Sequence, residues 1–288
     1  MNWLIYAILG IVLVGISPVF AKNGMRKCSS NLGAAIYGTV FFIAVNYMLS
    51  FMDISLNLAE MGQTVFAYLL FSGLSIGMMW ICLFRALKLW KINNVIPIVK
   101  ASLVFEILVG IFLLHDEVVR NKIIVLIVLS IGAVLMASNM GGKTPKNKIW
   151  IGNSLAAALF LSLTSLLGRV APGNIDNTFK YLICYGIALI VVWVLTFASG
   201  NHRGVSSMSF LDGIYLCISG VCTAGALYCF YNTTLLNPNI NLEMIGQFDL
   251  LATVILSYIF LKERLSTSAV LGMILMLIGY WVWYMNPI

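Results

Sequence analysis

Charged residues are scarce in this sequence. Lys, Arg, Asp and Glu together make up 9% of its 288 residues, whereas 61% of the residues are hydrophobic. A soluble domain carries about 25% charged residues, and 17 basic plus 10 acidic side chains cannot cover the surface of a soluble chain of this length. The composition therefore excludes a soluble globular protein and favours a chain embedded in a lipid bilayer.

Residues that carry catalytic or metal chemistry are also few. The chain has two histidines, and its six cysteines form no C-x-x-C pair and no Cys/His cluster with metal-ligand spacing. We therefore expect no enzyme activity, no metal and no cofactor. The net charge of +7 is spread over short segments between apolar runs, so we expect no nucleic-acid partner.

Long hydrophobic runs dominate what is present. A membrane-spanning helix needs about 20 mostly apolar residues. Ten runs meet this requirement, at 3–21, 31–52, 64–84, 92–114, 123–140, 149–168, 181–199, 211–233, 239–261 and 267–285. Aromatic residues near the span ends, such as Trp283 and Tyr284, fit interfacial anchors. The sequence predicts an all-α integral membrane protein with ten transmembrane helices.

The ten spans divide into two related halves. A shift of the chain against itself by 147 residues aligns Trp3 with Trp150, Lys22 with Arg169, Asn94 with Asn241, Asp116 with Glu263 and Gly132 with Gly279. The first five-helix repeat covers 1–142 and the second covers 148–288. Because five is odd, the second repeat must enter the bilayer upside down. Inverted repeats are typical of secondary transporters, with the site near the midplane between the halves.

Basic residues predict the orientation. We call the side of the membrane on which the chain begins side A, and the opposite side B. Side B holds Lys22, Arg26, Lys27, Arg85, Lys88, Lys91, Lys143, Lys146, Lys148, Arg203, Lys262 and Arg264, whereas side A holds Arg120, Lys122, Arg169 and Lys180. The positive-inside rule then makes side B cytoplasmic, with both termini outside the cell membrane.

Ionisable residues inside the spans mark the candidate site. Lys100 and Glu106 lie in the fourth span and Asp249 in the ninth, and each is costly at that depth. The 147-residue shift pairs Lys100 with Gln247, so polar stripes recur at equivalent positions. We expect Glu106 and Asp249 to approach each other near Lys100, binding an amine or zwitterion, and a desolvated carboxylate there suits proton transfer. The alternative is a structural charge network that ties the halves together. Glu243, near the start of the ninth span, is better explained as an interfacial residue.

Aromatic and small residues add two further expectations. Trp80 and Phe84 in the third span, with Tyr228 and Tyr231 in the eighth, could cage an ammonium group by cation–π attraction. Ordinary packing or lipid contact is the competing explanation. Small residues four apart, at Gly73 and Gly77 and at Gly220 and Ala224, predict a close contact between the third and eighth helices, in a monomer or across a homodimer.

The two halves end in a similar pattern. The first reads Leu113-Leu114-His115-Asp116-Glu117-Val118 and the second Phe260-Leu261-Lys262-Glu263-Arg264-Leu265-Ser266, each followed by an apolar helix with a late glycine. Together with the five-plus-five repeat, this resembles the EamA-like branch of the drug/metabolite transporter superfamily. The resemblance implies a cavity lined mainly by the third, fourth, eighth and ninth helices, with contributions from the first and sixth. It also implies cytoplasmic termini, opposite to the charge distribution.

These observations together predict a secondary active transporter. We expect alternating access and coupling to protons. The buried acids beside aromatic residues favour an amino acid or an organic amine as the cargo. Three alternatives remain at this stage. One is the flipping of a lipid-linked headgroup, and another is an integral-membrane enzyme. The third is a non-transporting membrane scaffold, against which the symmetric buried charges argue.

Overall fold

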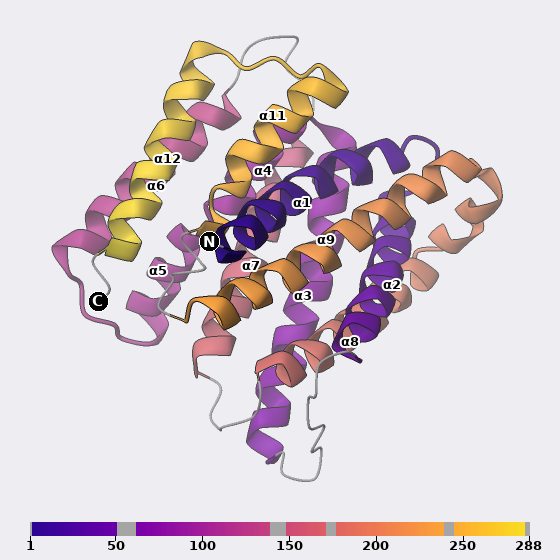
Figure 1. The fold of residues 1–288 in the computed structure, drawn as a ribbon, viewed down its shortest axis with the longest axis horizontal. Helices are drawn as coiled ribbons and strands as arrows, with labels where there is room; N and C mark the ends of the chain where they lie inside the picture. The colour runs from indigo at the N-terminus through magenta and orange to yellow at the C-terminus, as the bar shows by residue number, and fades with distance from the viewer. Residues whose placement is uncertain (1, 51–61, 139–147, 171–176, 239–244, 286–288) are drawn as a thin grey trace.

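The computed structural model describes residues 2–50, 62–138, 148–170, 177–238 and 245–285, and no strand occurs within these ranges (Figure 1). The α-helices of the first half are α1 (Asn2–Gly24), α2 (Ser30–Leu49), α3 (Gln63–Leu89), α4 (Ile92–Lys100), α5 (Ser102–Leu113) and α6 (Arg120–Ala137). Those of the second half are α7 (Ile149–Val170), α8 (Asn177–Ala198), α9 (Phe210–Leu236), α11 (Asp249–Leu261) and α12 (Thr267–Met285), with a 3₁₀ helix, η2 (Asn201–Ser207), before α9.

The helices confirm a multi-pass membrane fold. Within the described ranges, nine segments are long and apolar enough to cross a bilayer, and Asp249–Leu261 is a shorter apolar helix. The segment Ile92–Leu113 counts as one of the nine although it contains both α4 and α5. Together these segments account for the ten predicted spans. Residues 239–244 of the ninth span, Glu243 among them, lie outside the described residues.

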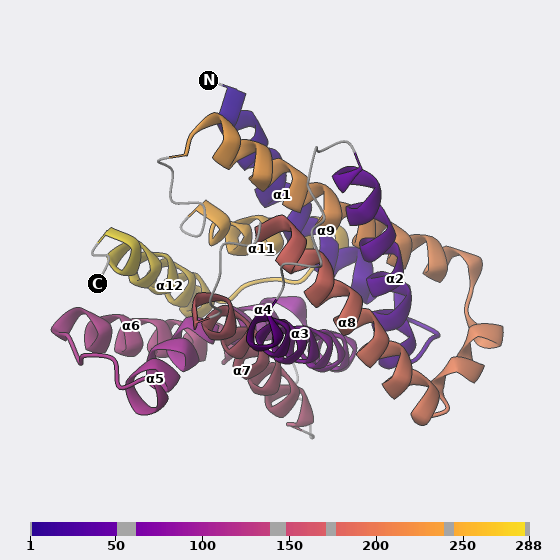
Figure 2. The same cartoon turned by 90° about the horizontal axis from the view of Figure 1, so that it is seen from below.

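Helices pack mainly across the two halves of the chain. Helix α1 lies along α9 and α3 lies along α7, and α6 lies beside α12 in both ribbon views (Figures 1 and 2). Each of these pairs joins one helix of the first half to one of the second. One cluster of buried side chains likewise draws on both halves. The two halves therefore share a single core.

Small residues set the closest of these contacts. A Cβ added to Gly73 would lie 2.6 Å from Ile187 Cβ of α8, and one added to Gly220 would lie 2.9 Å from the Tyr37 carbonyl of α2. The expected contact of these glycines between the third and eighth spans is therefore wrong. Instead, the small residues of α3, the third span, pack on α8, the seventh span. Those of α9, the eighth span, pack on α2, the second span, and under the repeat these two contacts are equivalent. Helical spacing identifies a small-residue face but not its partner.

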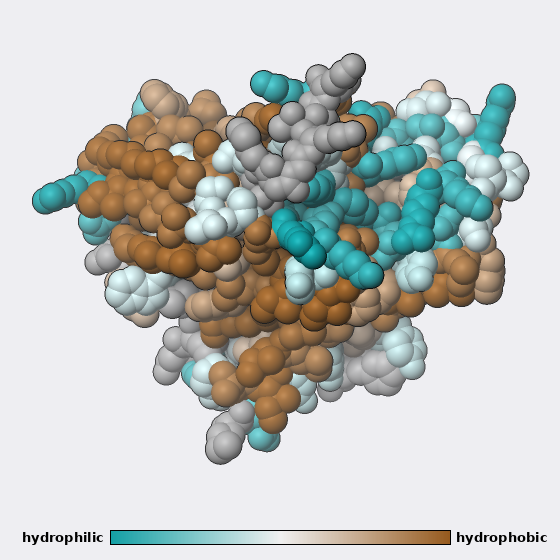
Figure 3. Space-filling model, turned by 90° about the horizontal axis from the view of Figure 1, so that it is seen from above, coloured by the Kyte–Doolittle hydropathy of each residue, from teal (hydrophilic) through white to brown (hydrophobic). Residues whose placement is uncertain are grey.

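The surface suits lipid. Figure 3 shows broad hydrophobic surfaces with hydrophilic side chains gathered in a limited region of that face. Large apolar side chains such as Ile5, Val134 and Phe210 are exposed by 66%, 65% and 83%. Exposure of this kind across many helices matches a chain whose outer surface is solvated by acyl chains.

The contact between α6 and α12 gives a first prediction. A Cβ at Gly272 would lie 2.6 Å from the Gly132 carbonyl oxygen, which cannot move without separating the two helices. We expect Gly272→Ala to lower the free energy of unfolding by about 1–3 kcal/mol, the usual range for overpacking. Thermal unfolding in detergent measures this change.

Gly152→Ala in α7 is the matched control, because nothing lies within 4 Å of its added Cβ. Alanine favours a helix over glycine by about 1 kcal/mol, so this variant should unfold at the same temperature as the wild type or slightly higher. Equal destabilisation by both substitutions would contradict the close contact.

Candidate functional site

The fourth span is interrupted near the centre of the molecule. Helix α4 ends at Lys100 and α5 begins at Ser102. The Val104 N–H donates to the Ala101 carbonyl at 2.9 Å, rather than four residues back to Lys100 as in a continuous α-helix. The Tyr280 hydroxyl of α12 donates instead to the Lys100 carbonyl. The interruption thus holds Lys100 at the end of a half-helix.

The ninth span is interrupted at the equivalent point. Helix α11 begins at Asp249, which the 147-residue shift pairs with Ser102, the first residue of α5. A turn precedes it, in which the Leu250 N–H donates to the Gln247 carbonyl at 3.2 Å. Gln247 is the equivalent of Lys100. The sequence predicted both spans as continuous runs, whereas interrupted helices are typical of transporter binding sites.

An ion pair joins the two interruptions. Lys100 Nζ lies 2.6 Å from Asp249 Oδ2. Lys100 stands at the C-terminal end of α4 and Asp249 at the N-terminal end of α11, so each charge is also favoured by the dipole of its own helix. The structure therefore brings together two of the three ionisable residues that the sequence placed deep in the spans.

Two acceptor atoms beside this pair lack hydrogen-bond partners among the described residues. They are Asp249 Oδ1 and Gln247 Oε1, both buried. The Asp249 residue as a whole is only 3% exposed. An unpaired buried acceptor costs about 1–3 kcal/mol, so most such atoms in proteins are paired. These two oxygens are therefore positioned to accept hydrogen bonds from a donor in the adjoining space.

That space is a cavity of about 630 Å³. Its volume is within the range of small-molecule sites, about 300–1,000 Å³. Four charged residues contribute to its lining, namely Lys100, Glu106, Lys180 and Asp249. Most of the lining lies in the side-A halves of the helices, including the end of α7, the start of α8 and the end of α12. The cavity therefore occupies the side-A half of the membrane region.

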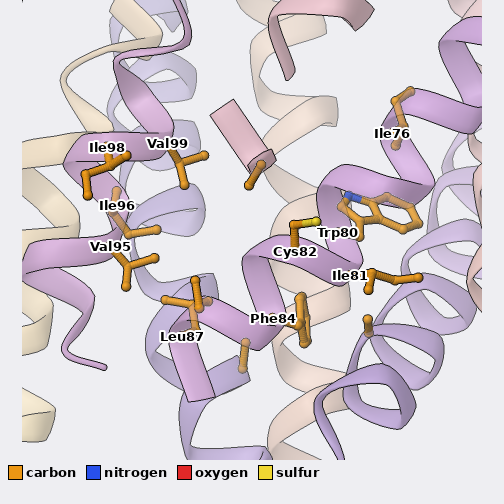
Figure 4. Close-up of a cluster of buried hydrophobic side chains, with 14 of the residues drawn as sticks. Ile76, Trp80, Ile81, Cys82, Phe84, Leu87, Val95, Ile96, Ile98 and Val99 are labelled. Atoms are coloured by element: carbon orange, nitrogen blue, oxygen red, sulfur yellow. The ribbon is translucent and has the colours of Figure 1, made fainter. Parts of the chain in front are cut away.

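The aromatic residues expected in the site lie elsewhere. Trp80 packs edge-on against Tyr37 and Phe41, with ring centroids 5.5 Å apart in each case. Figure 4 shows Trp80 and Phe84 among the buried side chains of α3. Neither of them lines the described cavity. On α3 the lining ends at Ile76, and Trp80 follows one turn further toward side B, where the helices close together.

The eighth-span tyrosines are also outside the lining. Tyr228 is 39% exposed on the protein surface, and neither it nor Tyr231 borders the cavity in the described part of the chain. The aromatic side chains that do contribute are Tyr68, Tyr181, Phe230, Tyr280, Trp283 and Tyr284. The sequence indicated interfacial anchoring for Trp283 and Tyr284, whereas the structure places both in the cavity lining. Their positions near the end of a span did not reveal which way the side chains face. The seventh and tenth spans, which are α8 and α12, therefore contribute to the lining in addition to the spans that the resemblance implied.

Comparisons with known proteins agree with this architecture. A model of the EamA-like transporter family matches residues 1–138 and again residues 148–285. A Sinorhizobium protein named as an uncharacterized transporter in the cobO 3′ region is 26% identical over 136 residues, which are 47% of this chain and 96% of that protein. A solved crystal structure of a protein at 13% identity superposes with a TM-score of 0.65, covering 98% of this chain and 97% of that one. This last likeness shows the fold alone.

The ion pair gives a second prediction. Lys100→Met removes the ammonium and leaves the Asp249 carboxylate buried without a cation. We expect a loss of about 3 kcal/mol in the free energy of unfolding, the lower end for breaking a buried pair, because the Lys100 side chain is 25% exposed. Adding Asp249→Asn removes the stranded charge and should recover most of the loss. Denaturant unfolding in detergent measures both variants.

Lys27→Met is the control for loss of one positive charge, since Lys27 is exposed in the loop after α1. It should leave the stability unchanged. A double variant no more stable than Lys100→Met alone would show that the two charges do not interact in the folded protein.

Proposed function

This chain belongs to the EamA-like transporter family, and we propose that it is a secondary transporter whose cargo presents a protonated amine to Asp249 and Gln247. The family makes it a membrane transporter. The proposal on cargo rests on one observation, the unpartnered acceptor atoms Asp249 Oδ1 and Gln247 Oε1 beside the cavity. An amino acid or an organic amine is the cargo class that this arrangement favours.

A primary ammonium group matches these acceptors. It has three N–H donors, enough to satisfy Asp249 Oδ1 and Gln247 Oε1 together while Lys100 keeps the other carboxylate oxygen. Tyrosine and tryptophan rings in the lining offer faces for cation–π attraction. Among them are Tyr280 and Tyr284, one helical turn apart on α12. These rings take the role that the sequence suggested for Trp80 and Phe84.

The other charges around the cavity favour a cargo that carries both signs. Lys100 and Lys180 contribute two positive charges to the lining, and Glu106 and Asp249 contribute two negative charges. A zwitterion entering such a balanced site adds no net charge, which limits the cost of burial. The N-terminal end of α5 at Ser102 also borders the cavity, and a helix N-terminus favours a carboxylate.

Proton coupling follows from competition for one carboxylate. Asp249 can accept either a proton or the cargo ammonium at its free oxygen, but a protonated carboxyl no longer attracts a cation. Binding of cargo and binding of a proton therefore exclude each other, so that inward movement of one accompanies outward movement of the other. Glu106, on α5 beside the same cavity, is the second acid available for this exchange.

Uptake into proteoliposomes gives the third prediction. A panel of amino acids, amines, nucleosides and sugars is offered with and without an imposed pH gradient. We expect gradient-dependent flux of a compound with a protonated amine. Asp249→Asn should reduce this flux at least about tenfold, because the charge-assisted hydrogen bond it removes is worth about 1.5–3 kcal/mol.

Glu117→Gln is the matched control, since Glu117 is an exposed acid in the loop on side A, and it should transport normally. Flux that Asp249→Asn leaves unchanged, in protein with normal unfolding behaviour, would contradict the proposed binding role of this residue. Absence of flux for every soluble compound, combined with movement of a lipid-linked headgroup analogue between leaflets, would favour the flippase alternative.

A further inference from the structure

A network around Glu263 closes the molecule on side B. Glu263 Oε1 accepts from Lys22 Nζ of α1 at 2.9 Å and from the Ile92 N–H at 3.2 Å, while Oε2 accepts from the Asn93 N–H at 3.2 Å. Lys22 Nζ also donates to the Trp90 carbonyl, at 2.6 Å, at the end of α3. The Glu263 carboxylate thus joins α1 and α4 of the first half directly, and Lys22 extends the network to the end of α3.

The chemistry of this network makes it a firm closure. Glu263 caps the start of α4, where the helix dipole and the free N–H groups favour a negative charge. Its bonds are charge-assisted, a type roughly twice as strong as neutral hydrogen bonds. The Glu263 side chain is only 8% exposed, so solvent weakens these bonds little. Among the described residues, the cavity lies in the side-A half and this network joins the two halves at side B, the arrangement expected of a carrier that is closed to side B.

The same turn occurs on side A, at the equivalent place in the first half. Asp116 is the equivalent of Glu263 under the 147-residue shift, and the residue before each has a left-handed backbone, with φ of 55° at His115 and 54° at Lys262. An equivalent hydrogen bond closes each turn, from Asp116 N to the Gly110 carbonyl at 3.0 Å and from Glu263 N to the Ser257 carbonyl at 3.4 Å. The two turns therefore share one backbone geometry.

Their carboxylates are nevertheless engaged differently. Among the described residues, Asp116 Oδ2 pairs with Lys122 Nζ of its own half at 3.5 Å, and the Asp116 side chain is 33% exposed. Glu263 is buried against the opposite half. Identical turns with unequal contacts are what an inverted repeat gives when one end of the molecule is closed and the other is open.

We infer that Asp116 and Glu263 are alternating gates, and that Asp116 closes side A when Glu263 releases side B. Under the 147-residue shift the residue equivalent to Lys22 is Arg169, so the repeat also supplies a basic residue for a contact of this kind on side A. One acid–base contact between the halves then replaces another of the same kind. Such an exchange keeps the two states close in free energy, as a carrier that populates both requires.

This inference rests on alternating access in the proposed function but not on the cargo. It can therefore be tested without any transported compound. The reporter is Ile76→Cys, at the floor of the cavity near the middle of α3, in a background whose six native cysteines are replaced. A membrane-impermeant thiol reagent is applied from either face of sealed, oriented vesicles, and the labelling rate from each face is measured.

We expect the unsubstituted gates to give faster labelling from side A. Glu263→Gln keeps one acceptor oxygen for the N–H groups of Ile92 and Asn93, but its amide NH₂ group replaces the second acceptor and the ion pair with Lys22 is lost. It should raise labelling from side B at least about tenfold and lower labelling from side A, because a charge-assisted bond biases the two-state equilibrium by that factor or more. Asp116→Asn should have the opposite sign, with labelling from side B falling further.

Glu117→Gln, next to Asp116 and exposed, is the control and should leave both rates unchanged. Unaltered side-B labelling in Glu263→Gln, with normal elution and unfolding, would overturn the gate assignment. Shifts in the same direction for Glu263→Gln and Asp116→Asn would overturn the alternation. If no compound in the uptake panel is transported, the labelling rates of these variants are still expected to shift as described. Failure of the cargo proposal is therefore distinguishable from failure of the gate assignment.

Discussion

The ion pair between Lys100 and Asp249 is the contact on which the central site depends. A charge inside a bilayer is tolerated when it is paired and faces protein or water, and here each half of the chain supplies one partner at 2.6 Å. Both residues stand where a spanning helix is interrupted. The interruptions supply helix ends and free backbone groups at the same depth as the charges, and the Tyr280 hydroxyl takes up one of the released carbonyls.

The membrane explains why the rest of the fold is built from contacts between the halves. Lipid offers no hydrophobic drive for one apolar helix to prefer another, so close packing of small residues and polar contacts determine the partners. Gly73 fits against α8, Gly132 and Gly272 meet between α6 and α12, and each contact crosses from one half to the other. An inverted repeat assembled in this way forms one body with equivalent surfaces toward both sides of the membrane.

The number of spans, the repeat and the charged residues inside the spans could be predicted from the sequence, because a bilayer constrains each of these features locally. The direction in which each side chain faces could not be predicted. Trp80 lies on the same stripe of α3 as the lining residue Ile76, yet one turn beyond the cavity floor. The interruption at Ala101 was hidden as well, since an interrupted span and a continuous one have the same hydropathy. Only the packing of neighbouring helices decides such cases.

The ion pairs Lys100–Asp249 and Lys22–Glu263, which each join the two halves, have complementary places in the molecule. Lys100–Asp249 lies at the centre, where the equivalent positions are Gln247 and Ser102 and no second charge pair is generated by the repeat. Lys22–Glu263 lies at one end, where the equivalent positions Arg169 and Asp116 preserve both charges. A central binding site serves both states of a carrier and needs only one copy. A closure is needed once on each side of the membrane, and accordingly both repeats have a basic and an acidic residue at the positions of Lys22 and Glu263.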